Sequence, residues 1–542
     1  MLGISSICLL VCLFLPFAST AAMVWRTGFY GVGMFATEVE SLSPEMRVTS
    51  SNDFITIQWP TATSNLTLET ICEFPASNGW AAVTNLQAEV GGEAAVTLPV
   101  TNTQQFYRLE GPYTCFIPIF SFAIFYNELL EFTWSATMTV RGRVHANADI
   151  YVGSSSDLSF SNTVTAGGMI TNRSWAGRAQ DQYVGSINYG GNPQFVVNAP
   201  KLALPIGTNN TSDTLREIIH VPPPDEDANS PMGQQRFYNK AGMALLVSNT
   251  AAATLITAAI KHRPTDSNPI VLQWSNSTPF FMSNNIVFAD QRENKWMRIT
   301  QIDMDRLRAW LNTNEAVAVK YPSGNPLNIL YVGDFRSTNS TTNTAVRLVN
   351  GRNLPPSPTA GGRPTGFTVA TPNPLYVLGH YNCTNSAHLG TTNTSSTVPA
   401  GLVSDALTIL SGNWQDSKST NTLISRTATS TTVNAAILTG TVYSQGAMGI
   451  SPYSGGVPNL PRLLEDWGNG SSSIVLTLNT SIVNLFSSAR ATAPFQNAGV
   501  YYYAPTRQFN FDYNFTDPAK LPPGTPLLEA VLPADLVTLP HP

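Results

Sequence analysis

Apolar and polar residues alternate strictly over residues 138–152, a pattern typical of a β-strand with one buried face. The same pattern returns twenty residues later, so that one apolar set is followed by a second, namely Met138, Val140, Val144, Ala146 and Ile150, then Leu158, Phe160, Val164, Ala166 and Ile170. A strand pattern with this period predicts successive layers of an irregular right-handed parallel β-helix, or β-solenoid. Two separate hairpins whose apolar positions agree by chance are the alternative.

Further apolar clusters follow at uneven intervals and are separated by loops rich in Ser, Thr and Asn. They lie at 329–332, 375–378, 406–409, 435–438 and 474–478. Strands separated by long polar loops extend the predicted solenoid over residues 136–530. A pair of packed sheets with long connections would give a similar sequence pattern.

The region before the repeat divides into two parts. Residues 44–110 contain short alternating runs, such as Ile55, Ile57 and Trp59, separated by turn clusters, which predicts a small β-sandwich-like module. Residues 111–135 are rich in aromatic side chains. We expect this segment to be a partly helical cap that covers the first layer of the solenoid.

Two helices are indicated inside the long domain. Asp303 has the chemistry of an N-cap, and Met304, Leu307, Trp310 and Leu311 form one apolar face behind it. A second, short helix is expected over residues 460–467, where Arg462 and Glu465 would form a surface ion pair.

The first 22 residues resemble a secretory signal peptide. An apolar run at 7–17 is followed by small residues at 18–22, although no Lys or Arg precedes it. An uncleaved membrane anchor is the alternative, but the run is short and contains Pro16. No later segment is apolar and long enough to cross a membrane, so we expect a secreted, cell-surface or periplasmic protein.

Composition narrows the functional classes. Only 12% of the residues are charged and the net charge is −5, without a run of Lys or Arg, which argues against a nucleic-acid partner. After the signal the chain keeps Cys72, Cys115 and Cys383, of which Cys72 and Cys115 would form one disulfide in an oxidising compartment. No spacing of Cys and His typical of zinc is present, so we expect no metal and no cofactor.

One polar set stands out in the repeat. Alternation places Arg143, His145, Asn147 and Asp149 on one face of a strand. A His–Asp pair on such a face is capable of acid–base chemistry. We interpret these residues instead as a solvent-exposed polar ladder and as a possible binding surface.

Other candidate residues are more scattered. His380 is expected to be a hydrogen-bonded turn residue rather than a ligand. Asp149, Asp405, Asp416 and Asp466 would support glycoside hydrolysis only if two of them converged on one groove. The aromatic tail at 501–512 is expected to be a terminal strand packed on the core, with stacking on sugars as the alternative.

Several phrases of the chain resemble secreted bacterial type IV pilus assembly (PilX-like) or pilus-associated proteins. They lie at 125–127, 138–151, 235–241, 347–351, 371–382, 453–456 and 521–526. The resemblance implies a cell-surface location and a role linked to pili, and it implies no catalytic residues. A prepilin leader is absent from this chain, which favours an accessory role over incorporation in the pilus shaft.

The sequence therefore predicts a non-enzymatic secreted or cell-surface protein with a pilus-associated structural or adhesive role. Its expected partners are pilus or cell-envelope proteins or a surface polysaccharide. The alternative is a carbohydrate-active enzyme, either a polysaccharide lyase or a hydrolase, on a β-helix scaffold. That alternative requires carboxylates, or Asp with Lys or Arg, that converge on one groove.

Overall fold

The computed structural model of the chain divides into two units, which are described separately. Unit 1 comprises Met1–Ile117 and Glu529–Pro542, and unit 2 comprises Pro118–Leu528. In unit 1 the structure describes residues 7–8, 11–12, 47–51, 54–60, 67–71, 81–84, 88–90, 93–99, 106–110, 112–117, 529–533 and 535–536. In unit 2 it describes residues 118–528 except 134, 136, 155, 174–184, 252, 263–265, 322–326, 356–358, 361–362, 365, 445–453, 455, 469–472 and 496–500. Cys72, the predicted disulfide partner of Cys115, lies outside the described residues.

Unit 1 contains two four-stranded antiparallel sheets, ordered β3-β4-β8-β7 and β2-β9-β5-β6, and a short parallel pair of β1 with β40. Ile55, Ile57 and Trp59 are buried along β4, as their alternation predicts. The strands are β1 (Ile7–Cys8), β2 (Val11–Cys12), β3 (Arg47–Ser51), β4 (Phe54–Pro60), β5 (Thr67–Ile71), β6 (Ala81–Ala82), β7 (Ala88–Val90), β8 (Glu93–Pro99), β9 (Phe106–Glu110), β10 (Pro112–Pro118), β39 (Leu527–Pro533) and β40 (Asp535–Leu536). Strands β10 and β39, which pair with each other, extend past the unit boundary.

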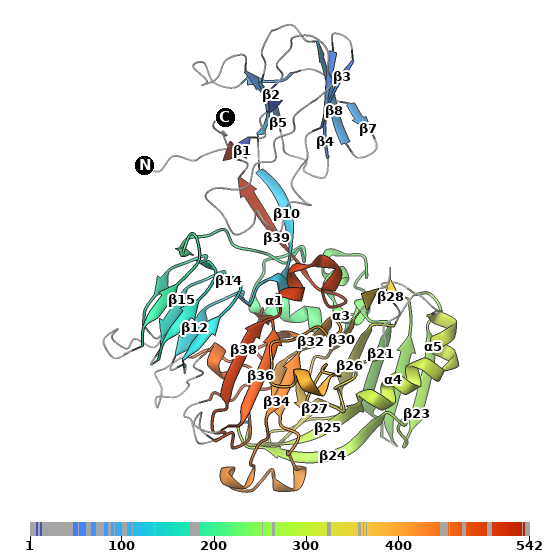
Figure 1. The fold of residues 1–542 in the computed structure, drawn as a ribbon. Coiled ribbons are helices and arrows are strands. Elements are labelled where there is room, and N and C mark those ends of the chain that lie inside the picture. The colour runs from blue at the N-terminus through green and yellow to red at the C-terminus, as the bar shows by residue number, and fades with distance from the viewer. Residues whose placement is uncertain are drawn as a thin grey trace. The chain divides into compact units, whose positions relative to one another are not determined.

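Unit 2 is mainly β and begins with short parallel strands stacked in three sheets (Figure 1). The sheets contain β11-β14-β17-β20, β12-β15-β18 and β13-β16-β19. Their strands are β11 (Ile124–Tyr126), β12 (Leu130–Thr133), β13 (Met138–Val140), β14 (Val144–Ala146), β15 (Ile150–Gly153), β16 (Leu158–Phe160), β17 (Val164–Ala166), β18 (Ile170–Thr171), β19 (Ile187–Tyr189) and β20 (Phe195–Val196).

The twenty-residue register read from the sequence is confirmed by the strand pairing. Met138 lies opposite Leu158, Val144 opposite Val164, and Ile150 opposite Ile170, all in parallel strands. Identical spacing on three sheets means that each layer repeats the backbone path of the layer before it. Apolar side chains from the two layers therefore stack in columns, and Val144 and Val164 in one such column are fully buried.

The aromatic segment 111–135 is not the partly helical cap that the sequence indicates. Apart from the short 3-10 turn Ile119–Ser121, its described part is extended and contains β11 and β12. These strands continue the twenty-residue register, because Ile124 lies opposite Val144 and Leu130 opposite Ile150. Phe122, Phe125 and Phe132 therefore lie in the interior of a further layer, which explains why they are buried.

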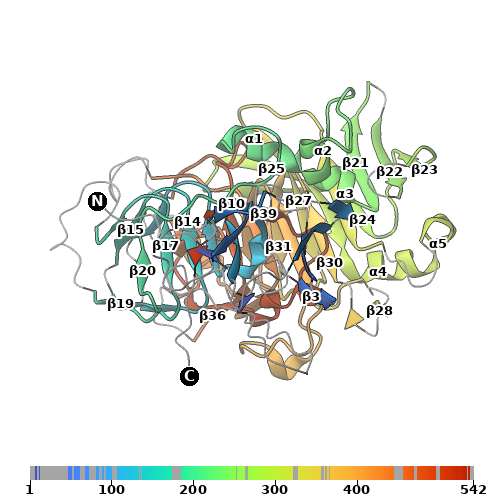
Figure 2. The same cartoon turned by 90° about the horizontal axis from the view of Figure 1, so that it is seen from above.

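This first layer lies in the middle of a long sheet rather than at its end. β11 pairs with β14 on one side and with β37, the last strand of the sheet in the chain, on the other. The twelve-stranded sheet runs β20-β17-β14-β11-β37-β35-β32-β30-β26-β21-β22-β23. Figure 2 shows β14, β17 and β20 toward one end and β21, β22 and β23 toward the other. From β11 the chain first adds β14, β17 and β20 on one side. It then continues at the other end of the sheet with β21, β22 and β23, and its later strands complete the sheet back to β37, next to β11.

The part of unit 2 that begins at β21 has longer strands. Its strands are β21 (Met243–Asn249), β22 (Thr254–Ile260), β23 (Ile270–Ser275), β24 (Met282–Asp290), β25 (Lys295–Asp303), β26 (Ile329–Asp334), β27 (Thr342–Val349), β28 (Thr359–Ala360), β29 (Arg363–Pro364), β30 (Phe367–Ala370), β31 (Pro374–Leu378), β32 (Ala400–Ser404), β33 (Ala406–Leu410), β34 (Thr431–Asn434), β35 (Ala436–Thr439), β36 (Val475–Thr480), β37 (Ile482–Asn484) and β38 (Thr506–Phe511). Besides the twelve-stranded sheet, these strands form the separate sheets β24-β25-β27-β31-β33 and β34-β36-β38.

The helices are short. They are α1 (Ser212–Arg216), α2 (Pro231–Gln235), α3 (Phe237–Lys240), α4 (Met304–Thr313) and α5 (Glu315–Lys320). The prediction of α4 is confirmed: the Asp303 side chain accepts a hydrogen bond from Arg306 N, while Met304, Leu307 and Trp310 are buried. The predicted helix at 460–467 is wrong, because the described residues there form isolated strand bridges at Arg462 and Asp466.

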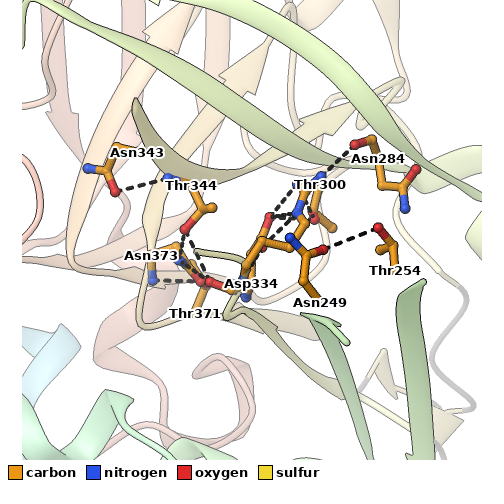
Figure 3. A network of polar contacts seen from close by, with 10 residues as sticks. Asn249, Thr254, Asn284, Thr300, Asp334, Asn343, Thr344, Thr371 and Asn373 are labelled. Carbon is orange, nitrogen blue, oxygen red and sulfur yellow. Dashed lines mark hydrogen bonds and ion pairs between the residues drawn. The ribbon is translucent and has the colours of Figure 1, made fainter. Parts of the chain in front are cut away.

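A buried polar network joins the long sheet to the five-stranded sheet (Figure 3). Asp334, which ends β26, forms an ion pair with Arg336 at 2.6 Å and accepts a hydrogen bond from Thr300 of β25 at 2.8 Å. Asn373 donates to the Asp334 carbonyl at 2.9 Å and accepts from its N–H at 2.8 Å. Asp334 is fully buried, so its charge depends on these partners.

Candidate functional site

The predicted polar ladder is buried rather than exposed to solvent. Arg143, His145 and Asn147 are at most 6% exposed, and only Asp149 is partly accessible. A segment that returns from elsewhere in the chain covers Asn147: the Asn147 amide donates to the Leu202 carbonyl at 2.7 Å, and its oxygen accepts from Leu202 N at 2.8 Å. Alternation in the sequence correctly separates the two faces of β14, but it does not show that both are covered.

His145 has structural partners and no acid–base partner. Its Nδ1 lies 2.7 Å from Thr165 Oγ1, its Nε2 lies 2.9 Å from Asn147 Oδ1, and its ring stacks on Phe125 with the centroids 5.5 Å apart. Burial lowers the pKa of His145 to about 4. The imidazole is therefore neutral at neutral pH, and its partner is Asn147 rather than the Asp149 carboxylate that an acid–base pair would need.

Arg143 is likewise held inside the protein. Its guanidinium donates to Ser121 Oγ at 2.8 Å and lies over the ring of Phe122, 4.7 Å from the centroid. Burial lowers its pKa to about 10, so the group remains charged at neutral pH. Arg143 thus anchors the segment before β11 and offers no surface charge to a ligand.

The four carboxylates considered for glycoside chemistry each serve a different part of the structure. Asp405 is buried and accepts hydrogen bonds from three successive residues, Ser488, Ala489 and Arg490. Asp416 pairs with Arg347 at 2.6 Å and accepts from Trp414 Nε1.

The other two hold local turns. Asp149 accepts from Met169 N and Tyr151 Oη, and Asp466 accepts from Gly468 N. Among the described residues, the hydrogen bonds of each carboxylate thus end on structural groups of its own surroundings, which gives each of the four a role in holding the fold.

Arg462 and Glu465 are buried and do not pair with each other. Arg462 forms an ion pair with Glu293 and donates to the Ala491 carbonyl. Glu465 accepts from Ser411 N at 2.6 Å and from Ser411 Oγ at 2.7 Å. Burial raises the pKa of Glu465 to about 7 despite these hydrogen bonds. Both residues fasten segment 460–467 to neighbouring strands.

His380 and the aromatic tail have the structural roles expected of them. His380 Nδ1 accepts from Thr432 N at 3.0 Å. The tail forms β38, the last strand of the sheet β34-β36-β38, in which Phe511 is 7% exposed.

Among the described residues, a groove between a loop and the segment that follows β38 offers room for a ligand. Its volume is about 430 Å³, and it is lined by Thr394, Ser395, Thr397, Val398, Pro399, Asp512, Asn514, Phe515, Ala519 and Lys520. We call it the 394/512 groove. Hydroxyl, amide, carboxylate and ammonium groups share its lining with the apolar side chains of Val398, Pro399 and Phe515.

A chain of hydrogen bonds fixes the polar side of the 394/512 groove. Thr394 Oγ1 donates to Asp512 Oδ1 at 3.0 Å, Asn514 Nδ2 donates to Thr394 Oγ1 at 3.0 Å, and Lys520 Nζ donates to Asn514 Oδ1 at 3.2 Å. Asp512 is 7% exposed, and burial raises the pKa of its carboxyl above the usual range. The polar groups are therefore positioned before any ligand arrives, which lowers the entropic cost of binding.

An asparagine ladder holds the loop that forms one wall. Asn434, Asn479 and Asn510 lie opposite one another on β34, β36 and β38, and Asn382 lies on the neighbouring layer. Asn479 Nδ2 donates to Asn434 Oδ1 at 2.8 Å and to the Thr391 carbonyl at 2.9 Å. Asn382 bonds both the N–H and the carbonyl of Val398. The interior of the stack thus fixes the loop at both ends.

The residues of this groove are not evident as a site from the sequence. The loop is visible as a polar insert at 391–398, and Asp512 closes the aromatic tail, but more than a hundred residues separate them. The ladder that brings them together has unequal spacings, from 382 to 434, 479 and 510, so no periodicity reveals it. The only available signal is that asparagines recur next to strand clusters.

Within the described ranges, no group of three or more His, Cys, Asp or Glu side chains is placed to hold a metal ion. No helix among the described residues is both long and apolar enough to span a membrane. Comparisons with family models, with curated proteins and with solved structures found no match to this chain.

Proposed function

We propose that this chain is a non-enzymatic secreted or cell-surface protein that binds carbohydrate in the 394/512 groove. We further propose that unit 2 is an irregular right-handed β-solenoid, a rigid scaffold that displays this groove. Three parallel sheets with a shared twenty-residue register support the scaffold assignment. The pilus-associated role remains a proposal that rests on the sequence resemblance alone.

The chemistry of the groove favours sugars. A carbohydrate presents many hydroxyl groups, each both donor and acceptor, together with an apolar ring face. Thr394, Asp512 and Asn514 offer matching acceptors and donors, and Val398 and Phe515 offer an apolar wall. A volume of about 430 Å³ lies within the size range of small-ligand sites.

One observation supports binding over hydrolysis. Asp512 is the only carboxylate among the described residues that line the groove. Glycoside hydrolysis by the common mechanisms uses a pair of carboxylates about 5–10 Å apart. A lone buried carboxylate that is already bonded to Thr394 and Asn514 is suited to accept hydrogen bonds from a ligand.

Binding to a panel of immobilised oligosaccharides tests the proposal, followed by calorimetry with the best ligand. Thr394→Val and Lys520→Ala should each weaken binding about fivefold or more, because each removes one polar contact worth about 1 kcal/mol or more. Lys201→Ala is the matched control, since Lys201 is exposed and does not line the groove.

Two results would contradict the proposal. Absence of binding to every oligosaccharide in the panel removes the carbohydrate assignment. Cleavage of a bound oligosaccharide, detected as new reducing ends or unsaturated products, replaces it by the carbohydrate-active enzyme.

A further inference from the structure

Asparagines followed two residues later by Ser or Thr recur along this chain. This triplet, with any residue but Pro in the middle, is the acceptor motif for N-linked glycosylation of secreted proteins. The motif alone is common and weakly specific. Among the described residues, the structure separates its copies into exposed ones, at Asn209, Asn276, Asn339 and Asn393, half-buried ones, at Asn172, Asn210 and Asn514, and buried ones, at Asn382 and Asn479.

The copy at Asn339-Ser-Thr341 has the most suitable local geometry. Asn339 lies in the connection between β26 and β27, where residues 337–341 are all exposed. Asn339 Oδ1 accepts hydrogen bonds from Thr341 N at 2.9 Å and from Thr341 Oγ1 at 3.0 Å. The amide oxygen is thus held against the Thr341 hydroxyl. No hydrogen bond of Asn339 Nδ2 is recorded within the part of the chain that the structure describes.

The two buried copies show the opposite arrangement. Asn382 is 4% exposed, and its Nδ2 donates to the carbonyls of Val398 and Asn434. Asn479 is 1% exposed, and its Nδ2 donates to Asn434 and Thr391. A glycan on either nitrogen would displace the asparagine ladder, so these triplets are incompatible with modification in the folded chain.

We propose that Asn339 is an N-glycosylation site. The donor is an oligosaccharide linked to a lipid through a diphosphate. The Asn339 amide nitrogen forms a bond to the anomeric carbon of the first sugar as the bond from that carbon to the diphosphate oxygen breaks. The lipid diphosphate departs with the electron pair, and one amide proton passes to a base of the transferase.

This inference rests on the secreted location in the proposed function, and the test keeps the two apart. The complete chain, preceded by a host secretion signal, is expressed in a eukaryotic cell that performs N-glycosylation. Export then does not depend on residues 1–22, and the same chain without the added signal tests those residues separately. Occupancy is measured by peptide mass spectrometry before and after an amidase that converts glycosylated Asn to Asp.

We expect a glycan at Asn339 and unmodified side chains at Asn382 and Asn479. Asn339→Gln and Thr341→Ala should each remove one mobility step on a gel, whereas Thr341→Ser should retain it, because Ser keeps the hydroxyl. Asn421→Gln is the control, since Asn421 is exposed but lacks the motif. Exported, folded chain with unmodified Asn339 overturns the inference, as does a glycan at Asn382.

Failure of the proposed function gives a different result. Loss of oligosaccharide binding with Asn339 still glycosylated contradicts the groove assignment alone. Retention in the cytoplasm of the chain without the added signal contradicts the secreted location alone.

Discussion

The side-chain amide of Asn382 bonds the backbone of Val398 as a neighbouring strand would, through both the N–H and the carbonyl. Val398 N donates to Asn382 Oδ1 at 3.1 Å, and Asn382 Nδ2 donates to the Val398 carbonyl at 2.8 Å. Asn147 forms the same pair with Leu202. In both places one buried asparagine holds a segment that lies outside the stacked strands. The polar interior of the layers therefore determines which loops cover them.

Replacement of Asn382 by Gly tests this relationship. Asn382 has a φ of 53°, a conformation that Gly adopts without strain, so the substitution removes the amide alone. We expect the free energy of unfolding to fall by roughly 2–3 kcal/mol, because several buried hydrogen bonds are lost. Urea denaturation measures this change, and oligosaccharide binding should weaken as the groove wall loosens.

Asn294→Gly is the matched control for that experiment. Asn294 has a φ of 53° and is exposed, so its loss should change stability by less than about 0.5 kcal/mol. Equal effects of the two substitutions would mean that backbone freedom, rather than the amide of Asn382, dominates.

Because Glu465 is buried, the free energy of unfolding should decrease as the pH rises and its carboxyl group ionises. Its pKa is about 7 in the folded chain against an ordinary value of 4.5, so the folded state binds the proton more tightly than the unfolded state does. Stability therefore falls between about pH 4.5 and pH 7, by up to about 3 kcal/mol. Glu465→Gln keeps a group that bonds Ser411 and should remove this slope. Urea denaturation at pH 5 and pH 7.5 measures the difference between variant and parent.

Glu315→Gln, at an exposed glutamate, should leave the slope unchanged. If the parent and the Glu465→Gln variant had the same pH dependence of stability, folding would not raise the proton affinity of Glu465.

His145 should give a slope of the opposite sign. Burial lowers its pKa from 6.5 to about 4, so the unfolded chain binds the proton more tightly. Stability is retained above about pH 6.5 and is lost as the pH falls toward 4, by up to about 3 kcal/mol. His145→Gln should flatten the acid side of the stability profile. His262→Gln, at an exposed histidine, should leave the acid side of the profile unchanged. If both substitutions flattened it, the loss of stability in acid would not come from the burial of His145.

Asp334→Ala should be strongly destabilising because it leaves the buried charge of Arg336 without its partner. Breaking one side of a buried ion pair costs about 3–5 kcal/mol. Asp305→Ala breaks the exposed Asp305–Arg308 pair and should cost less than about 1 kcal/mol. Thermal and urea unfolding of the two variants compare the pairs directly, and similar losses would contradict a special role for the network in Figure 3.

Local periodicity predicts some of these features well. The register that places Val144 opposite Val164 and the N-cap at Asp303 both follow from residues close together in the sequence. The burial of Asn147 does not, because Leu202, which bonds it, arrives from a distant part of the chain. The 394/512 groove could not be predicted for the same reason. Thr394 and Asp512 are distant in the sequence, and the asparagine ladder that brings them together has irregular spacing.

The cap prediction failed because an aromatic-rich segment next to a repeat has two physical explanations. It either covers the end of a stack or lies between two stacks. Phe122 and Phe125 are buried in both cases, so composition does not distinguish them. Only the pairing of β11 with β37, from the opposite end of the domain, shows that the segment lies between layers.

That pairing has a consequence for how the chain is made. Ser481 Oγ bonds the Phe122 carbonyl across a separation of 359 residues. At synthesis rates of roughly 5–20 residues per second, β11 waits about 20–70 seconds for its second neighbour. During that time one edge of β11, with its unsatisfied backbone groups, remains open to other strands in the cell. The step that joins β37 to β11 therefore both completes the sheet and ends the period in which the new chain is most exposed to aggregation.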